Sequence, residues 1–231
     1  MPKKRMSGPS RKQAIVQAAL PMFAKQGFEA TTTKKLAEAA GVSEALLYKH
    51  FPSKESLYAE IKGFGSRGQD PEFTRLLALK PSTETLILLV YGLMVRFVMR
   101  EGGGPLDWET RVRLILLSCL EDGSFLRFLF KNYFGESLER VAQSFKAAAA
   151  EDLVESPASA QNRFLFTHHL AIMIGCAHLP AKPAVEYGVT DRELLRQAMW
   201  YALRGLWFKD EVIDRSLDMS ELERKLTKVT S

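Results

Sequence analysis

Residues 36–52, LAEAAGVSEALLYKHFP, decide the fold, because two short helical patterns flank a sharp turn in this stretch. Gly41 allows the chain to reverse tightly, and Ser43 is placed to cap the N-terminus of the second helix. Leu47 and Phe51 lie four residues apart on one face of that helix, and the proline that follows ends it. The stretch therefore predicts a helix-turn-helix, whose second helix projects its remaining side chains outward.

The sequence on either side predicts further helices. Apolar residues recur with helical spacing from Lys12 to Phe23, and Gly27 is placed to end that helix with a positive φ. Three threonines at residues 31–33 offer N-cap hydroxyls to the first helix of the motif. Ser53 caps a fourth helix in the same way.

The rest of the chain also shows helical periodicity, and no run of residues alternates as a strand would, so we expect an all-α fold. Residues 63–71 break the pattern, which predicts a boundary between residues 1–62 and a larger helical domain, residues 63–231. In that domain we expect helices near residues 82–100, 107–120, 124–152, 159–178, 190–208 and 214–228.

Positive charge is concentrated at the start of the chain. Residues 1–62 hold 11 Lys and Arg against 5 Asp and Glu, whereas residues 63–231 hold 21 against 22. A basic small domain beside a nearly neutral larger one indicates a module that binds a polyanion. Charge alone does not distinguish nucleic acid from an acidic membrane surface.

Composition places the chain among ordinary globular proteins, with 231 residues, 46% hydrophobic and 26% charged. Two cysteines, Cys119 and Cys176, are too few for a disulfide framework, and we expect a cytoplasmic protein. The longest apolar stretch, residues 86–95, is shorter than the roughly 20 residues of a membrane-spanning helix. Residues 63–68 match G-x-G-x-x-G but follow a helix, so we interpret them as a linker. We expect no enzyme and no cofactor.

Three segments, FAKQGFEATT (23–32), LAEAAGVS (36–43) and LYKHFPSKE (47–55), closely resemble the TetR family of bacterial transcriptional regulators. The resemblance does not extend recognisably into residues 65–231. It implies a three-helix DNA-binding domain followed by a ligand-binding and dimerisation domain. It also implies that a ligand shifts the dimer to a spacing of reading helices that no longer fits DNA.

The resemblance also implies which residues touch DNA. It assigns phosphate contacts to Thr33, Tyr48, His50 and Lys54. It assigns base-edge contacts to five residues, with lysine donating to guanine, glutamate accepting from cytosine and apolar groups meeting thymine methyls. These residues are Lys34, Glu44, Ala45, Leu46 and Lys49. We also count the capping residue Ser43 among the predicted DNA-binding residues. Glu44 has a second interpretation, as an acidic residue that favours the positive end of its helix.

The basic residues before the motif have two interpretations that we weigh equally. They either add phosphate or minor-groove contacts, or form a merely solubilising tail. They are Lys3, Lys4, Arg5, Arg11 and Lys12.

The helix near residues 190–208 is apolar almost all round, so other helices must cover it. Small residues at i, i+4 and i+7, with a glycine on the preceding helix, allow close helix approach, and members of the TetR family pair through their last two long helices. We therefore predict a homodimer through Gly175, Leu195, Ala198, Ala202 and Gly205. The alternative is packing within one chain. A two-fold dimer predicts an inverted-repeat operator in double-stranded DNA.

Apolar stripes between these regions are mostly core, but a subset could line a cavity for a small lipophilic effector. The candidates are Leu93, Phe97, Leu117, Phe128, Tyr133 and Met173. Two alternatives remain open. One is a constitutive DNA-binding dimer without a ligand. The other is a metal-responsive regulator that uses His169, Met173 and Cys176, at i, i+4 and i+7 of one helix; packing is the favoured interpretation of these three, and we assign no metal.

Overall fold

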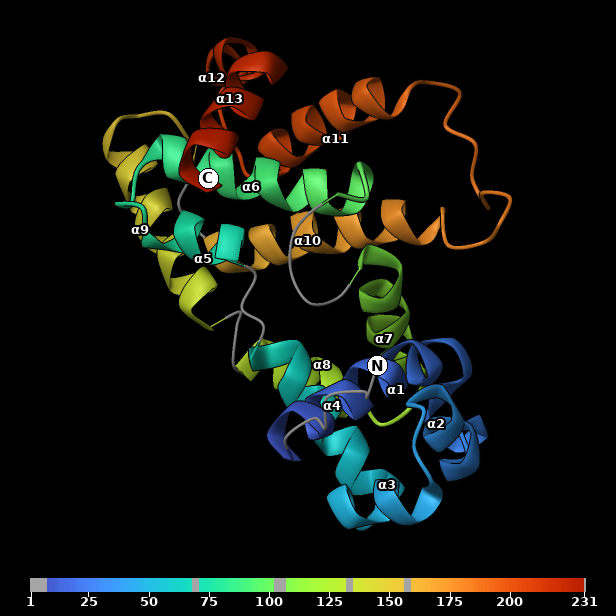
Figure 1. Ribbon diagram of the computed structural model, residues 1–231. Coiled ribbons are helices and arrows are strands. Elements are labelled where there is room, and N and C mark those ends of the chain that lie inside the picture. The colour runs from blue at the N-terminus through green and yellow to red at the C-terminus, as the bar shows by residue number, and fades with distance from the viewer. Residues whose placement is uncertain (1–7, 68–70, 102–106, 132–134, 156–158, 231) are drawn as a thin grey trace. The chain divides into compact units, whose positions relative to one another are not determined.

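The computed structural model describes residues 8–67, 71–101, 107–131, 135–155 and 159–230 (Figure 1). These ranges are helical apart from the connections, of which residues 177–190 form a long one, and one isolated β-bridge between Val154 and Phe208, which confirms the all-α prediction. Within them, no helix combines the length and apolarity needed to cross a bilayer. The helices are α1 (Gly8–Ala30), α2 (Thr33–Ala39), α3 (Glu44–His50), α4 (Lys54–Arg67), α5 (Pro71–Ala78), α6 (Thr83–Val98), α7 (Trp108–Leu120), α8 (Ser124–Leu129), α9 (Gly135–Ala150), α10 (Ala160–Cys176), α11 (Asp191–Gly205), α12 (Asp210–Ser216) and α13 (Met219–Thr230).

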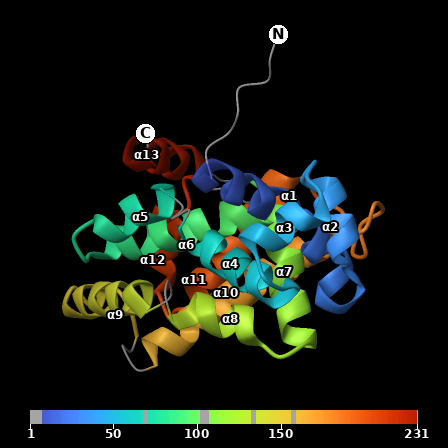
Figure 2. The same ribbon diagram turned by 60° about the horizontal axis from the view of Figure 1, so that its bottom comes forward.

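Contacts divide the chain into two compact units. The first comprises residues 1–68 and 113–129, and the second comprises residues 69–112 and 130–231. The first unit thus includes most of α7 and all of α8, which the expected division at residue 62 assigned to the larger domain. The reason is tertiary packing, since α8 contacts α4 although more than 50 residues separate them in sequence (Figure 2).

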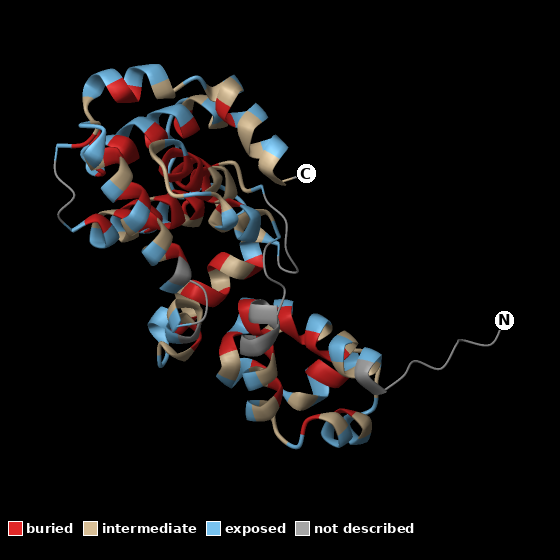
Figure 3. Cartoon of the chain, turned by 90° about the vertical axis from the view of Figure 1, so that its left-hand side faces the viewer, coloured by how far each residue is buried: buried red, intermediate tan, exposed pale blue. Residues whose placement is uncertain are grey.

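The core of the first unit lies between α1, α2, α3 and α4, and Figure 3 shows buried residues on the inner side of these helices. Large buried side chains come from all four helices and from the residue after α3: Ile15, Phe23, Leu36, Leu47, Phe51, Leu57 and Ile61. Gly27 has φ 78°, so the chain leaves the helical conformation at the residue where we expected it to. A further helical turn then runs to Ala30.

Helix α4 continues to Arg67, through residues that the sequence predicted as a break. The glycines at 63 and 65 each cost a helix only about 1 kcal/mol relative to alanine, and the buried Leu57 and Ile61 anchor the preceding turns. Residues 63–67 therefore lie in a helix and do not follow a strand. This geometry agrees with the interpretation that the G-x-G-x-x-G match is not a dinucleotide loop.

Helix α6 is the centre of the second unit and contacts α5, α9, α10, α11 and α13. Eleven of its sixteen residues are buried, which explains why its sequence is apolar on nearly every side. In Figure 1, α10 and α11 run along opposite sides of α6. Gly175 of α10 allows a close approach, since a Cβ there would lie 3.1 Å from the carbonyl oxygen of Phe97.

Two expected helices are each divided in the structure. The helix expected over residues 124–152 is α8 and α9, with the connection at residues 132–134 outside the described residues. The helix expected over residues 214–228 is α12 and α13. The second break has a local cause, because the Asp218 carboxylate accepts hydrogen bonds of 3.0 Å from the backbone N–H groups of Ser220 and Glu221 and so caps α13.

A buried histidine makes stability depend on pH. His168 of α10 lies edge-on to the Phe97 ring, 5.8 Å between centroids, and burial, with a smaller effect of His169, lowers the pKa of His168 to about 3. An unfolded histidine titrates near pH 6.5, so below that pH the unfolded chain binds a proton that the folded chain does not. We expect the free energy of unfolding to fall by about 1 to 2 kcal/mol between pH 7 and pH 5 from this group.

Urea unfolding at several pH values measures this dependence. The variant His168→Gln cannot titrate in this range, so its pH profile should be flatter than that of the wild type. The exposed His169 provides the control, since His169→Gln should retain the wild-type slope. Equal slopes for wild type and His168→Gln would contradict the assignment.

Candidate nucleic-acid interface

Helix α3 is held at both ends by local interactions. The Ser43 hydroxyl accepts a hydrogen bond of 3.2 Å from the Leu46 N–H, which caps the N-terminus as predicted. Leu47 is 2% exposed and anchors the helix on the core, and the Phe51 N–H donates to the Leu47 carbonyl at 2.8 Å. The rest of the short helix therefore turns toward solvent.

The turn before α3 has the predicted geometry. Gly41 has φ 63°, a conformation that glycine adopts without strain. The Val42 N–H donates to the Ala37 carbonyl at 2.9 Å, and the Thr32 hydroxyl caps α2 by accepting from the Lys35 N–H at 3.3 Å. Helices α2 and α3 contact one another across this turn, so residues 33–50 form a helix-turn-helix.

Three predicted contact residues are joined by hydrogen bonds across this motif. The Tyr48 hydroxyl donates to Thr33 Oγ1 at 3.3 Å, and the Thr33 hydroxyl donates to Glu44 Oε2 at 3.2 Å. Glu44 and Tyr48 are exposed, and Thr33 is half-buried. The network orients the start of α2 and the outer face of α3 together, and it provides a role for Glu44 beyond its position in the first turn of α3. The spacing of these residues in the sequence did not indicate this hydrogen-bond network.

Two lysines on this surface have exposed side chains, Lys34 on α2 and Lys49 on α3. Among the described residues, neither ammonium group makes a hydrogen bond or an ion pair. Ala45 is also exposed, and Leu46 and His50 are half-buried. The surface therefore combines two free cations with small and apolar groups, which is a composition suited to base edges in a major groove.

Lys54 and Lys12 differ from these two lysines, because each of their ammonium groups has a partner within the protein. The Lys54 ammonium donates to the Phe28 carbonyl at 2.9 Å and lies 4.1 Å from the centroid of the Phe28 ring, so it fastens the end of α1 to α4. The ammonium of Lys12, a residue of helix α1, is 2.9 Å from Glu60 Oε2. Lys12 is therefore an ion-paired helix residue and not part of a free arm. Residues 3–5 of the expected arm lie outside the described residues.

Glu121, just after α7, contacts the segment that leads into the motif. Its Oε1 accepts a hydrogen bond of 3.3 Å from the Phe28 N–H. Beside it, Tyr58 packs on Phe23 and Phe28 with centroid distances of 5.1 Å each. Burial raises the pKa of Tyr58 to about 12, with smaller effects of the carboxylates of Glu121 and Asp122. The phenol is thus neutral at physiological pH, and the end of α7 is bonded to the chain just before α2.

The cap of α3 supports a stability prediction. Removal of the Ser43 hydroxyl leaves the Leu46 N–H without its partner, so Ser43→Ala should lower the free energy of unfolding by about 1 kcal/mol. Urea denaturation measures this change. Ser43→Thr retains the hydroxyl and should recover most of the loss. Equal stability of Ser43→Ala and wild type would show that the cap contributes nothing.

The six residues predicted for an effector cavity are not gathered at one described site. Leu93 and Phe97 are buried in α6, whereas Leu117 is half-buried in the part of α7 that belongs to the first unit. Met173 is 61% exposed. The side chain of Phe128 and residue Tyr133 lie outside the described residues. None of the four described residues lines the three cavities described in the second unit.

The small-residue stripe predicted for a dimer interface faces the interior of the protomer. Leu195, Ala198 and Ala202 are 3%, 6% and 2% exposed, because α11 packs this face on α6. Gly175 is buried against α6 as well, and Gly205 is exposed. This burial within the protomer is the arrangement that the alternative prediction, packing within one chain, describes. The large apolar side chains that remain exposed on these two helices are Phe166, Met173, Trp200 and Tyr201.

The three residues of the alternative metal site are not joined by further metal ligands among the described residues. His169 and Met173 are exposed on α10, and Cys176 is half-buried near its end. In the part of the chain that the structure describes, no group of three or more His, Cys, Asp and Glu side chains could hold a metal ion. The imidazole and thiol groups of this stripe therefore lack a third ligand of those types within the described ranges.

Comparison with known proteins identifies the motif. Residues 15–61 match the family model of the bacterial regulatory proteins of the tetR family. The nucleoid occlusion factor SlmA of Vibrio vulnificus (strain YJ016) is 36% identical over 95 residues, which cover 41% of this chain and 48% of that protein. The chain thus spans about half the length of the curated relatives it matches.

Two solved structures share the fold over most of the chain. One is the TetR family transcriptional regulator PfmR from Thermus thermophilus, with a TM-score of 0.58, 20% identity, and coverage of 83% of this chain and 98% of that chain. The other is AibR in complex with isovaleryl coenzyme A and operator DNA, with a TM-score of 0.61, 18% identity, and coverage of 83% and 97%. The matched residues 15–61 contain the whole helix-turn-helix described above, so this part of the chain is similar to the bacterial regulatory proteins of the tetR family.

Proposed function

We propose that this protein is a cytoplasmic, one-component transcriptional repressor. In this proposal a homodimer binds an inverted-repeat operator in double-stranded DNA and blocks transcription by occupying it. A small lipophilic effector then binds the second unit and releases the DNA. The observation that carries the DNA-binding part is the exposed outer face of α3, with Lys49, Ala45 and the Thr33–Glu44–Tyr48 network on one surface.

In this proposal, some residues of the surface contact bases and others contact phosphates. Lys34 and Lys49 have free ammonium groups that can donate to guanine, and Ala45 and Leu46 can contact thymine methyl groups. Thr33, Tyr48 and His50 are assigned to phosphates, where they fix the register of the helix without selecting a sequence. We keep Lys54 in the set as a phosphate contact only if its ammonium leaves the Phe28 carbonyl on binding.

Tyr48 provides a test of the phosphate role. We expect Tyr48→Ala to weaken binding to every DNA sequence by about the same factor, roughly tenfold, because the hydroxyl contacts the backbone and holds Thr33 in place. Fluorescence anisotropy with an operator and an unrelated duplex measures both affinities. Exposed Gln13 of α1 supplies the control variant, Gln13→Ala. Loss of affinity for the operator alone would assign Tyr48 to base recognition instead.

The exposed apolar side chains of α10 and α11 support dimerisation. Phe166 and Met173, seven residues apart on α10, are 67% and 61% exposed, and Trp200 and Tyr201 of α11 are 43% and 64% exposed. Large apolar residues grouped on a surface mark sites of association. We therefore move the proposed interface from the buried stripe to these four residues and Gly205, which is one turn beyond Tyr201.

Helix α7 supports coupling between effector and DNA. It begins in the second unit, and its end belongs to the first, where Glu121 accepts a hydrogen bond from the Phe28 N–H just before α2. A shift of α7 on effector binding would therefore act on the start of the helix-turn-helix. The solved AibR complex contains both isovaleryl coenzyme A and operator DNA, so one relative in fold binds both kinds of partner.

A constitutive DNA-binding dimer without an effector is the second candidate. One observation supports it: the four described residues of the predicted effector cavity do not line the three cavities described in the second unit. Thermal unfolding in the presence of a panel of lipophilic molecules distinguishes the two. A ligand that binds the folded state raises the melting temperature, which would argue against the constitutive version.

Selection of bound sequences from a random pool of double-stranded DNA tests the main proposal. The experiment uses the purified full chain at physiological salt without added ligand. Enrichment of an inverted repeat is expected, because a two-fold dimer presents two copies of α3 about 34 to 36 Å apart or somewhat further. Salt-sensitive binding without an enriched sequence would reduce the protein to a non-specific basic module.

A further inference from the structure

A groove of about 780 Å³ between α5, α6 and α13 carries an excess of positive charge. We call it the basic groove. Its volume lies within the range of small-molecule sites. One carboxylate, that of Glu84, faces five cationic side chains, and the six charged lining residues are Arg75, Lys80, Glu84, Arg224, Lys225 and Lys228. The groove lies wholly within the second unit.

Three of these cations are already engaged. Arg224 forms two hydrogen bonds with Glu221, of 2.7 and 2.8 Å, and an Arg75 guanidinium nitrogen donates to the Thr230 carbonyl. The Lys225 ammonium lies 2.6 Å from Glu84 and 3.6 Å from Glu221. Lys80 and Lys228 differ, since neither ammonium has a hydrogen bond or an ion pair among the described residues. Two charges in the groove therefore have no internal counterion in that part of the chain.

The same groove has an apolar side and a helix end. Ala78, Leu79, Leu88 and Val229 contribute hydrocarbon to its wall. Ser82, the N-cap of the sixteen-residue helix α6, also lines it and accepts a hydrogen bond of 3.1 Å from the Thr85 N–H. The partial positive charge of a helix N-terminus adds to that of the lysines. The groove is therefore cationic at one place and apolar at another.

We propose that the basic groove binds an anionic amphiphile, a molecule with a carboxylate or phosphate head group on an apolar chain. Lys80 and Lys228 supply the counter-charges for the head group, and Leu79, Leu88 and Val229 contact the chain. This binding is a property of the second unit, does not depend on DNA binding, and lies apart from the residues predicted for a lipophilic effector.

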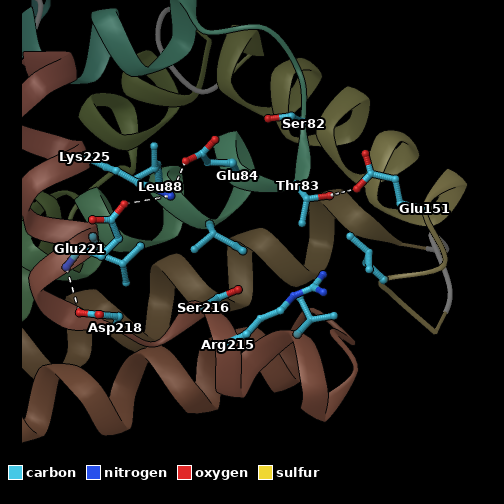
Figure 4. A pocket seen from close by; sticks show the side chains of 14 residues that line it. Ser82, Thr83, Glu84, Leu88, Glu151, Arg215, Ser216, Asp218, Glu221 and Lys225 are labelled. Carbon is cyan, nitrogen blue, oxygen red and sulfur yellow. Dashed lines mark hydrogen bonds and ion pairs between the residues drawn. The ribbon is translucent and has the colours of Figure 1, made fainter.

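A neighbouring cavity explains why an anion prefers the basic groove. The second cavity, about 500 Å³, shares Ser82, Glu84, Leu88 and Lys225 with it. Figure 4 shows Lys225 between Glu84 and Glu221, with Asp218 farther along the same wall. Glu151 adds a fourth carboxylate, against Arg215 and Lys225 as the cations of this cavity. The excess of carboxylates repels an anion, so the Glu84–Lys225 pair separates an acidic cavity from the basic groove.

Isothermal calorimetry on the full-length protein without DNA tests the proposal, with decanoate, decyl phosphate and decanol below their aggregation concentrations. We expect at least one of the two anions to bind with a dissociation constant below about 1 mM and decanol to bind at least about tenfold more weakly, because decanol lacks the charge. Preference for decanoate or for decyl phosphate identifies the head group. Equal binding of decanol, or binding of none of the three, would overturn the proposal.

Charge variants locate the site. Lys80→Gln combined with Lys228→Gln removes two charges and no described bond, and should weaken binding of the anion about five- to tenfold. Lys131→Gln combined with Lys146→Gln changes the net charge equally at exposed lysines outside the groove, and should leave binding unchanged. Equal effects of the two double variants would mean that only overall charge matters and would overturn the site.

Two further variants test the acidic residue of the basic groove and the space inside it. Glu84→Gln removes the only carboxylate among the described lining residues of the basic groove and releases Lys225, so it should tighten anion binding about threefold or more. Ala78→Trp, at an exposed position of α5, fills the groove and should abolish binding of the anion. Unchanged binding in Ala78→Trp, with a native unfolding transition, would place the ligand elsewhere. Operator affinity, measured separately on the wild type, reports on the proposed repressor function and not on this site.

Discussion

Tyr201→Glu is expected to convert the proposed dimer to monomers and to weaken operator binding at least about a hundredfold. Tyr201 of α11 is 64% exposed in the protomer, so its replacement leaves the protomer core intact. In a two-fold dimer both copies of the new carboxylate enter one apolar interface, where an unpaired charge is costly. A monomer then presents a single α3 of seven residues, and the gain of roughly 10²- to 10⁴-fold from joining two binding modules is lost.

Light scattering coupled to size-exclusion chromatography reports the mass, and titration of the selected operator reports the affinity. Leu120→Glu is the control, because Leu120 is 82% exposed at the end of α7, outside α10 and α11. The Leu120→Glu protein should keep the mass of a dimer. A Tyr201→Glu protein that remains dimeric and binds the operator normally would contradict the proposed interface.

Lys49→Ala is expected to relax the choice of base at one position in each half-site by about 1 to 3 kcal/mol, because a lysine contact to guanine discriminates against the other bases by this amount. The Lys49 ammonium has no partner among the described residues, so the free protein should keep its stability. Competition binding against the set of single-base variants of the selected operator measures the discrimination directly.

A second lysine separates base recognition from simple loss of charge. Lys25, exposed on α1, lies outside the helix-turn-helix, and Lys25→Ala removes the same charge. It should reduce affinity slightly and equally for all sequences and leave base preference intact. If Lys49→Ala also changes all affinities by one factor, Lys49 contacts phosphate and the base-reading residues must be sought among Lys34, Ala45 and Leu46.

The helix-turn-helix could be predicted because the interactions that form it are local. Ser43 and Thr32 each accept a hydrogen bond from an N–H group three residues later, and Gly41 has the positive φ that the turn requires. The apolar spacing of Leu47 and Phe51 defined the buried side of α3. Such interactions span a few residues, so the residue types and their order are sufficient to indicate them.

The contacts that distinguish the functional residues span longer distances. Lys54 was predicted to reach DNA, but its ammonium binds the carbonyl of Phe28, 26 residues earlier. The Glu121–Phe28 hydrogen bond joins residues 93 positions apart, and it decides that the end of α7 belongs with the DNA-binding helices. No pattern in either segment contains this pairing.

In the second unit, too, sequence patterns do not identify the contacts between residues that are far apart in sequence. Periodicity placed Ala198 and Ala202 on an apolar face of α11, but a helix covered by its own chain and a helix covered by a partner have the same pattern, and here α6 covers that face. The basic groove likewise joins Arg75 and Lys80 to residues 224–229, which are far away in sequence. Local sequence was sufficient for the all-helical class, the caps of α2 and α3 and the basic helix-turn-helix, because these follow from neighbouring residues. Which faces are buried and which distant charges meet depends on how the helices pack, and no local pattern contains that information.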